Sequence, residues 1–242
     1  MLPSVTASTY DFSDLRAIYI NCTLKRSPEI SNTAGLMAVS TAIMRRHGVH
    51  VDEIRAVDHD LAPGVQADMT EFGFDRDDWP PIYRTVQAAD ILVIATPIWL
   101  GDKSSMCTRV IERLYANSGE LNDAGQYAYY GKVGGVIVTG NEDGIKHVAM
   151  NLLYSLQHLG CVIPPQADAG LDRRSRTWTV VPRRGVGWAG ERVTQRNTVF
   201  MTWNLMHLAA MIKGAGGIPA HGNSRQAWDD GARFDHPFLS MS

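Results

Sequence analysis

Hydroxyl and cationic side chains gather in residues 21–33, directly after a short apolar run at residues 17–20. The apolar run is typical of a strand, and a helical pattern begins at about Ala34. A loop between a strand and a helix offers free backbone N–H groups and the positive end of the helix, which together bind phosphate. The candidate phosphate ligands are Thr23, Lys25, Ser31, Asn32 and Thr33.

This loop differs from the two commonest nucleotide-binding loops. It has neither the glycine–lysine pattern of a nucleoside-triphosphate P-loop nor the G-x-G-x-x-G of a dinucleotide fold. Its hydroxyls suit a terminal monoester phosphate. The alternative is an N-cap, with Ser31 or Asn32 capping the helix. Thr23 and Lys25 have no role in capping, which favours the phosphate interpretation, although Lys25 alone fits a solvated side chain equally well.

Strands alternate with helices along most of the chain. The expected strands are residues 17–21, 49–57, 91–95, 131–140 and 161–163, and the expected helices are residues 33–46, 82–89, 105–115 and 145–159. This alternation predicts an α/β fold with a doubly wound, five-stranded parallel sheet of order 2-1-3-4-5. The loops after the first, third and fourth strands then meet at one edge of the sheet, where such folds bind ligands.

The segments that do not follow this alternation of strands and helices suggest where the domain begins and ends. We expect an N-terminal extension (1–14), one domain (15–213) and a C-terminal tail (214–242). Within the domain, residues 164–195 combine arginines with tryptophans and show no helical or strand periodicity of apolar residues, which predicts an inserted arm or lid. Its arginines fit either a nicotinamide phosphate or a solvated loop. A last helix is expected at residues 198–213.

Composition excludes several classes of function. The chain has 242 residues, 45% hydrophobic and 20% charged, and a net charge of -2, which argues against binding nucleic acid or an anionic membrane. Its three cysteines form no C-x-x-C pair, so neither structural zinc nor an iron–sulfur cluster is expected, and no metal is predicted. With no signal-peptide pattern and no apolar run of membrane-spanning length, we expect a cytoplasmic protein.

Three motifs resemble those of the flavodoxin-like NAD(P)H-dependent FMN reductases, a superfamily of flavin, quinone and azo reductases. The first motif is Thr23-Leu24-Lys25 followed by Ser31-Asn32-Thr33, which is similar to the family's Ser-Pro-Arg … Ser-Asn-Thr phosphate loop. The second is T-P-I-W-L-G at residues 96–101 with Ser104-Ser105, and the third is V-T-G at 138–140 with Gly144. Lysine in place of arginine keeps a cation but loses the bidentate guanidinium.

The resemblance implies a flavodoxin-like fold, FMN as cofactor and a set of flavin contacts. The loop after the third strand would contact the isoalloxazine through Pro97, Ile98, Trp99, Leu100 and Gly101. The loop after the fourth strand would hold the pyrimidine edge through Thr139, Gly140, Asn141 and Gly144. Trp99 and His147 are candidates for the catalytic face. The alternatives are a core tryptophan, a surface histidine and an ordinary turn with Asp143 as N-cap.

The function implied is an FMN-dependent oxidoreductase that passes electrons from NADPH or NADH to a quinone, a flavin or another small aromatic acceptor. Hydride transfer depends on the cofactor more than on protein acids or bases. Members of the family form homodimers or homotetramers, so we expect one of these states. The alternative functions are a flavodoxin-like electron carrier without turnover of its own, and a redox sensor or scaffold that has lost tight flavin binding.

Overall fold

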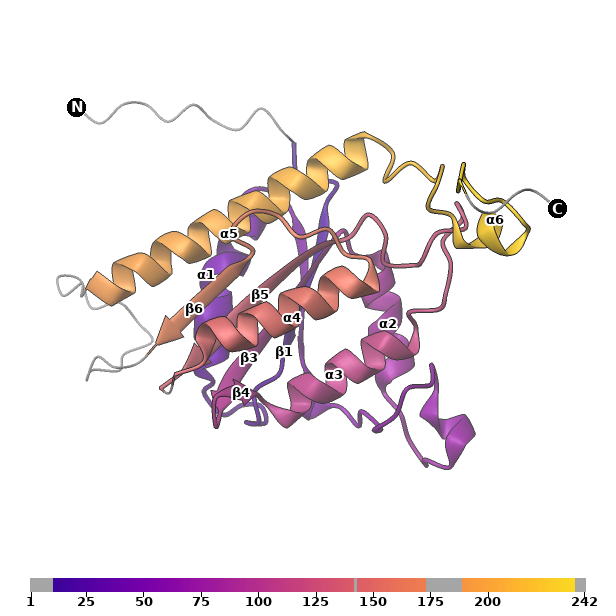
Figure 1. Ribbon diagram of the computed structural model, residues 1–242. Helices are drawn as coiled ribbons and strands as arrows, with labels where there is room; N and C mark the ends of the chain where they lie inside the picture. Colours follow the sequence, from indigo (N-terminus) through magenta and orange to yellow (C-terminus); the bar gives the residue numbers. More distant parts are fainter. Residues whose placement is uncertain (1–10, 142, 173–188, 238–242) are drawn as a thin grey trace, which may run out of the picture.

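The computed structural model describes residues 11–141, 143–172 and 189–237, and its strands and helices alternate as expected (Figure 1). The strands are β1 (Arg16–Asn21), β2 (His50–Arg55), β3 (Ile91–Trp99), β4 (Asp102–Lys103), β5 (Val133–Gly140) and β6 (Asp168–Asp172). The helices are α1 (Asn32–Arg46), α2 (Trp79–Ala88), α3 (Ser105–Ala116), α4 (Ile145–Leu159), α5 (Ala189–Gly214) and α6 (Arg225–Asp229), with 3₁₀ turns η1 (Ala56–Asp58) and η2 (Met69–Phe72).

The predicted doubly wound sheet is confirmed. Five parallel strands pair in the order β2-β1-β3-β5-β6. This is the expected order 2-1-3-4-5, because β4 is a two-residue strand that pairs only with the end of β3, in antiparallel fashion. The third, fourth and fifth main strands of the sheet are therefore β3, β5 and β6.

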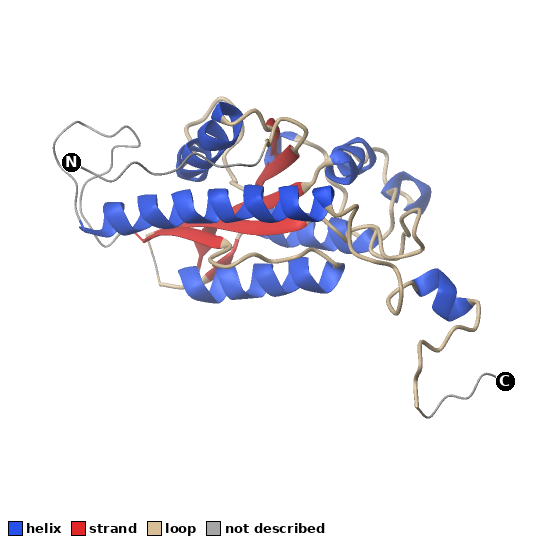
Figure 2. Ribbon diagram, turned by 90° about the horizontal axis from the view of Figure 1, so that it is seen from above, coloured by secondary structure: helices blue, strands red, loops and turns tan. Residues whose placement is uncertain are grey.

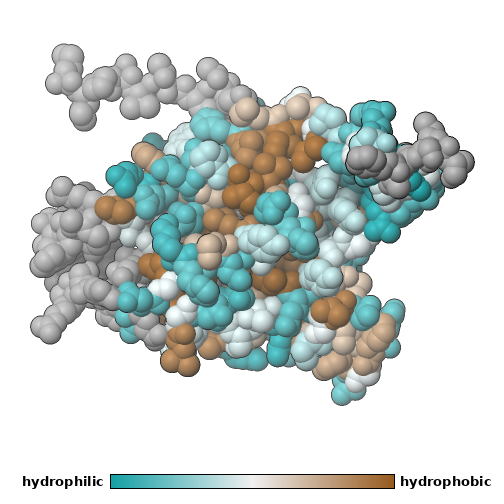
Figure 3. Space-filling view, in the orientation of Figure 1, coloured by the Kyte–Doolittle hydropathy of each residue, from teal (hydrophilic) through white to brown (hydrophobic). Residues whose placement is uncertain are grey.

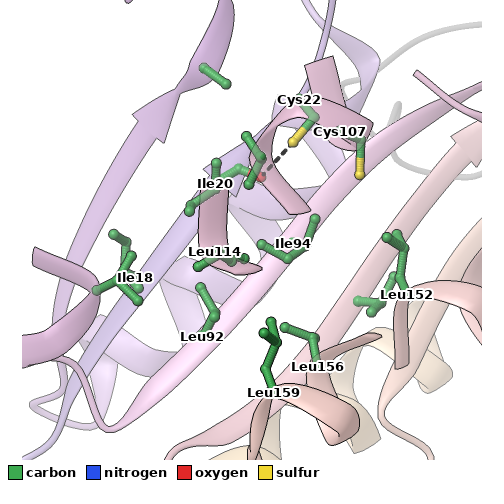
Figure 4. Packing of buried hydrophobic residues seen from close by; sticks show 14 of the residues in the cluster. Ile18, Ile20, Cys22, Leu92, Ile94, Cys107, Leu114, Leu152, Leu156 and Leu159 are labelled. Carbon is green, nitrogen blue, oxygen red and sulfur yellow. Dashed lines mark hydrogen bonds between the residues drawn. The ribbon is translucent and has the colours of Figure 1, made fainter. Parts of the chain in front are cut away.

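Alternate residues of the central strands point to opposite faces of the sheet, and each face has its own hydrophobic core. One face packs under α2, α3 and α4 and includes Ile18, Ile20, Leu92 and Ile94. Figure 4 shows these four side chains on two neighbouring strands, with leucines of α3 and α4 around them. The other face, with Tyr19 at its centre, packs under α1 and α5. Figure 2 shows helices on both sides of the strands.

The last strand lies later in the chain than the sequence predicts. Residues 161–163 form only one isolated bridge, between Val162 and Val133. Pro164 and Pro165 interrupt the ladder because proline has no N–H to donate. Pairing with β5 resumes at Asp168, which stands opposite Val136, so β6 is formed by the sequence D-A-G-L-D. The prediction of a strand at 161–163 was therefore wrong in length and position.

Two helices begin earlier than expected. α2 begins at Trp79, so the two prolines that follow it lie in its first turn, where proline is tolerated. α5 begins at Ala189 and runs for 26 residues, and it lies across the sheet in Figure 1. The central part of the predicted arm, residues 173–188, lies outside the described residues. Its two flanks belong to β6 and to the first turns of α5.

A buried ion pair anchors the long connection between β2 and α2. The Nη2 atom of Arg113 lies 2.6 Å from Oδ2 of Asp77, and neither side chain is accessible to solvent. Arg113 also donates to the carbonyl oxygens of Gln66 (2.6 Å) and Ala67 (3.1 Å). The connection thus folds around one guanidinium on α3.

The surface over α3 and α4 is mixed in character. In Figure 3, which has the orientation of Figure 1, hydrophobic residues form separate patches among hydrophilic ones. Exposed apolar side chains on α4 include Met150 and Tyr154. Scattered apolar groups of this kind are usual on folded proteins.

Candidate functional site

Three loops leave the carboxyl edge of the sheet next to one another, because β1, β3 and β5 are adjacent and parallel. The register places Asn21 of β1 beside Ala95 of β3, and Pro97 of β3 beside Thr139 of β5. The three stretches that the sequence singled out therefore meet at one rim, as the predicted sheet order requires.

The loop after β1 turns sharply and is buried where it begins. Thr23 is buried, and its backbone N–H donates to Oδ1 of Asn21 at 3.0 Å. Beyond it, the loop is exposed. The ammonium of Lys25 pairs with Glu29 at 3.0 Å and donates to the carbonyl of Ile30 at 3.2 Å. This predicted phosphate ligand thus points toward its own loop in the structure.

The beginning of α1 combines a cap with buried hydroxyls. Ser31 is the N-cap, and its Oγ accepts from the N–H of Ala34 at 3.2 Å, so the alternative interpretation of a cap at Ser31 is confirmed. Asn32 follows, partly exposed, at the first position of the helix. Ser31 and Thr33 are both buried. Capping leaves the other N–H groups of the first turn to face the loop.

One hydrogen bond joins the phosphate loop to the loop after β5. Oγ1 of Thr33 lies 2.8 Å from Oγ1 of Thr139, and both side chains are buried. These two residues were predicted to contact opposite ends of one ligand, the phosphate and the pyrimidine edge. The structure brings them into direct contact, which places α1 against the end of β5.

Ser104 joins the end of β3 and the start of α3 to the loop after β1. Its Oγ donates to the carbonyl of Cys22 at 2.7 Å and accepts from the N–H of Cys107 at 3.1 Å. Its N–H donates to Oγ1 of Thr96 at 3.2 Å. Ser104 is the N-cap of α3. Its contact with the β1 loop had no signal in the sequence.

The stretch T-P-I-W-L-G is a hairpin rather than an open loop. β3 continues to Trp99, and the chain returns as β4 after a turn at Leu100 and Gly101, which both have positive φ (51° and 80°). Ile98 is buried, whereas Trp99 is 54% and Leu100 94% exposed. The interpretation of Trp99 as a core residue was therefore wrong. The hairpin presents an indole and an aliphatic side chain at the rim.

Glycines let this hairpin approach the loop after β5. A Cβ atom on Gly144, where φ is 126°, would lie 2.6 Å from the carbonyl oxygen of Gly101. A position with positive φ whose Cβ would collide with backbone is compatible only with glycine. Gly144 is also the N-cap of α4, so the alternative interpretation, with Asp143 as the N-cap, was wrong by one residue. A Cβ atom on Gly140 would instead meet the side chain of Ile98, at 2.9 Å, and Asn141 is exposed.

The predicted catalytic candidate on α4 lies at the edge of this rim. His147 is exposed in the first turn of the helix. The pKa of Asp102 on β4 is lowered, chiefly by the hydrogen bond from the Lys103 N–H and in smaller part by the nearby His147. Lys103 itself donates to Oδ1 of Asn151 on α4 at 3.0 Å, which fixes β4 against that helix.

Among the described residues, no group of three or more His, Cys, Asp or Glu side chains is placed to hold a metal ion. The donors in the three loops are instead hydroxyls, backbone N–H groups and the ammonium of Lys25. That set fits a phosphate, and the exposed Trp99 and Leu100 of the hairpin offer an apolar surface to a flat ring.

Comparison with known proteins agrees with this geometry. The profile of a family described as NADPH-dependent FMN reductase matches residues 15–174. The 8-demethyl-8-aminoriboflavin-5′-phosphate synthase of Streptomyces davaonensis is 34% identical over 209 residues, which cover 82% of this chain and 79% of that protein. The crystal structure of RosB with bound 8-demethyl-8-formylriboflavin-5′-phosphate has a TM-score of 0.74 and 32% identity, covering 94% of this chain and 91% of that one.

A further relative is much longer than this chain. The divalent metal cation transporter MntH of Mycobacterium bovis is 59% identical over 202 residues, which cover 84% of this chain but 30% of the transporter. In the part of the chain that the structure describes, no helix has the length and apolar character needed to cross a membrane. From its profile match and its flavin-processing relative, the chain belongs to the NADPH-dependent FMN reductase family of flavodoxin-like oxidoreductases, whose cofactors are FMN and NADPH.

Proposed function

We propose that this chain passes electrons from NADPH, through bound FMN, to a quinone, a flavin or another small aromatic acceptor. The observation that carries the proposal is the direct joining of three loops at one rim, through Thr33 with Thr139 and through Ser104 with Cys22. Such a rim holds its backbone donors in fixed positions before a ligand arrives, and preorganised donors are the protein's main contribution to flavin chemistry.

The loop after β1 would hold the phosphate of FMN. Thr23, Ser31 and Thr33 supply hydroxyls, and the first turn of α1 supplies backbone N–H groups at its positive end. Lys25 lies in the same loop, where its ammonium offsets negative charge while it stays paired with Glu29. The site therefore offers more neutral donors than cations, which suits a singly esterified phosphate close to the protein backbone.

The hairpin and the β5 loop would hold the isoalloxazine. FMN, when bound, supplies the two-electron chemistry of hydride transfer. Residues 97–101 and 139–144 would supply backbone N–H groups, and donors near the pyrimidine edge stabilise negative charge there. The exposed indole of Trp99 and the exposed side chain of Leu100 give an incoming planar molecule an apolar surface to lie against.

The first experiment is an anaerobic titration of the FMN-loaded protein with NADPH and with NADH, followed by visible absorption. We expect the flavin bands to bleach directly to the two-electron reduced form, and to return on addition of a quinone. Bound flavin that ignores both nucleotides but forms a stable semiquinone with dithionite would contradict the proposal and favour an electron carrier.

The placement of the phosphate is tested separately with Ser31→Ala and Thr33→Ala. Each variant removes a hydroxyl from the proposed site, so we expect the Kd for FMN to rise by roughly tenfold, the equivalent of one hydrogen bond to a charged group. Ser118→Ala, beyond the far end of α3, is the matched control. FMN affinity unchanged in both variants would show that the phosphate binds elsewhere.

A second candidate function is favoured by the matches to flavin-processing proteins: the flavin phosphate itself is the substrate. The Streptomyces enzyme is named for the synthesis of a modified flavin phosphate, and the RosB structure holds another. The test is to recover the flavin after incubation with NADPH and measure its mass and visible spectrum. Recovery of unaltered FMN would agree with a reductase. A chemically modified ring would instead show that the protein modifies flavin.

The assembly and division of the chain are also proposals. We propose a homodimer or homotetramer, with the tail (214–242) held as a separate segment beside the domain (15–213). Light scattering coupled to gel filtration measures the mass in solution, and a monomer at all concentrations would contradict the assembly. Limited proteolysis that leaves residues 15–213 intact would agree with the division.

A further inference from the structure

The exposed part of the phosphate loop is held from the side by an acidic residue that follows β2. Both carboxylate oxygens of Asp58, at the end of η1, bond to one residue of the loop, Ser27. The Ser27 N–H donates to Oδ1 at 2.9 Å, and its Oγ donates to Oδ2 at 2.6 Å. These two bonds lower the pKa of Asp58, the larger effect coming from the side-chain bond.

Arg55 holds the same loop at two further points. Its Nη1 donates to the carbonyl of Glu29 at 3.0 Å and approaches that of Lys25 at 3.4 Å. Arg55 is the last residue of β2 and stands opposite Asn21, the last residue of β1. The contacts from Arg55 and Asp58 therefore begin where the two neighbouring strands end, beside the start of the phosphate loop.

Burial cannot hold this part of the loop in place. Residues 24–30 are all exposed, and the side chain of Ile30 is 77% exposed. Ordering each residue of such a segment costs roughly 1–2 kcal/mol of backbone entropy. Lys25 contacts Glu29 and Ile30 within the loop itself. The polar contacts from Arg55 and Asp58 tie the loop to the end of β2 and so fix its path between Thr23 and Ser31 relative to the sheet.

We infer that Asp58 and Arg55 are positioning residues for the flavin phosphate: they shape residues 24–30 so that Thr23 and Ser31 converge on it. This inference rests on the proposed placement of the phosphate in this loop. The charge of Asp58 makes the role distinctive. A carboxylate near a phosphate repels it, so removal of the charge alone would tighten FMN binding, whereas loss of positioning would weaken it.

The test measures the Kd for FMN and for riboflavin, which lacks the phosphate, in the wild type and in Asp58→Asn. Asp58→Asn makes both bonds to Ser27 neutral, and charge-assisted hydrogen bonds are about twice as strong as neutral ones. We therefore expect it to raise the Kd for FMN by about tenfold and to change the Kd for riboflavin by less than about twofold. Ser27→Ala removes one bond of the pair and should act in the same direction. Asp60→Asn, an exposed aspartate two residues further on, is the matched control with the same change in charge.

The possible outcomes distinguish a failure of the positioning role from a failure of the phosphate placement. FMN binding that is unchanged or tighter in both Asp58→Asn and Ser27→Ala overturns the positioning role. An equal loss for FMN and riboflavin also overturns it, because the damage would then be general. A wild type that binds FMN no more tightly than riboflavin refutes the phosphate placement itself, and the positioning role with it.

Discussion

Ser104→Ala tests whether one buried hydroxyl contributes both to the unfolding free energy and to FMN affinity. The substitution removes one hydroxyl and leaves the Cβ atom, so packing around the position is unchanged. Its two short hydrogen bonds are lost, the cap on the N–H of Cys107 and the bond to the carbonyl of Cys22, together with a longer one (3.4 Å) from Oγ1 of Thr96. The first belongs to α3 alone, and the second joins α3 to the phosphate loop.

The expected loss of unfolding free energy is about 2–4 kcal/mol. Loss of a serine N-cap costs about 1 kcal/mol. The carbonyl of Cys22 belongs to a fully buried residue, and a buried acceptor left without its donor costs about 1–3 kcal/mol. Because the β1 loop also loses its tie to α3, we expect FMN affinity to fall as well, by roughly tenfold, the equivalent of about 1.4 kcal/mol.

Urea unfolding at neutral pH measures the first effect, and flavin fluorescence quenching measures the second. Ser105→Ala is the matched control, since Ser105 is the exposed first residue of α3 and should lie within about 0.5 kcal/mol of the wild type. A Ser104→Ala protein as stable as the Ser105→Ala protein would refute the reasoning, because the buried bonds would then contribute nothing.

Three further predictions concern single residues. Arg113→Met should lower the unfolding free energy by about 3–5 kcal/mol, because the buried Asp77 loses its charged partner. In urea unfolding, the double variant with Asp77→Asn should recover part of this loss. No recovery would contradict an energetic coupling between the two residues. Leu100→Asn should stabilise by about 1 kcal/mol, since asparagine tolerates φ of 51° better, and a lower Tm would show that the leucine is needed. Burial lowers the pKa of His207 below 6.5, so the unfolded chain takes up a proton at this residue before the folded chain does as pH falls. The unfolding free energy should therefore drop below pH 6.5, and should drop less in His207→Gln. Superimposable curves of unfolding free energy against pH for the two proteins would refute this.

Much of the central fold could be predicted because local signals and burial agree there. The helix expected at residues 145–159 has those bounds in the structure, since glycines with positive φ stand at both ends, Gly144 and Gly160. The continuous apolar run of β3 predicted a strand covered on both faces, and its residues 91–96 are buried. By contrast, β6 has no apolar run to identify it, because its position is set by pairing with β5 rather than by its own composition.

The candidate site was predictable as a set of loops but not as a set of contacts. The strand order alone brings the loops after β1, β3 and β5 together. The bond between Thr33 and Thr139 joins residues far apart in sequence, and two threonines carry no pattern that would pair them. The hairpin at Leu100 was also missed, because a leucine with positive φ contradicts the usual turn preferences. Lys25, in contrast, has its partner Glu29 four residues on, a spacing that the sequence displays.

The hydrogen bond between Thr33 and Thr139 also has a consequence for the order in which the protein folds. It closes a span of 106 residues, and the bond between Ser104 and Cys22 closes one of 82. Contacts so distant in sequence form after local ones, because the entropy of closing the chain must be overcome first. β1, α1 and β2 can assemble with their phosphate loop long before the walls of the rim exist. The complete flavin site therefore forms late in folding, and full binding of the flavin stabilises the assembled state.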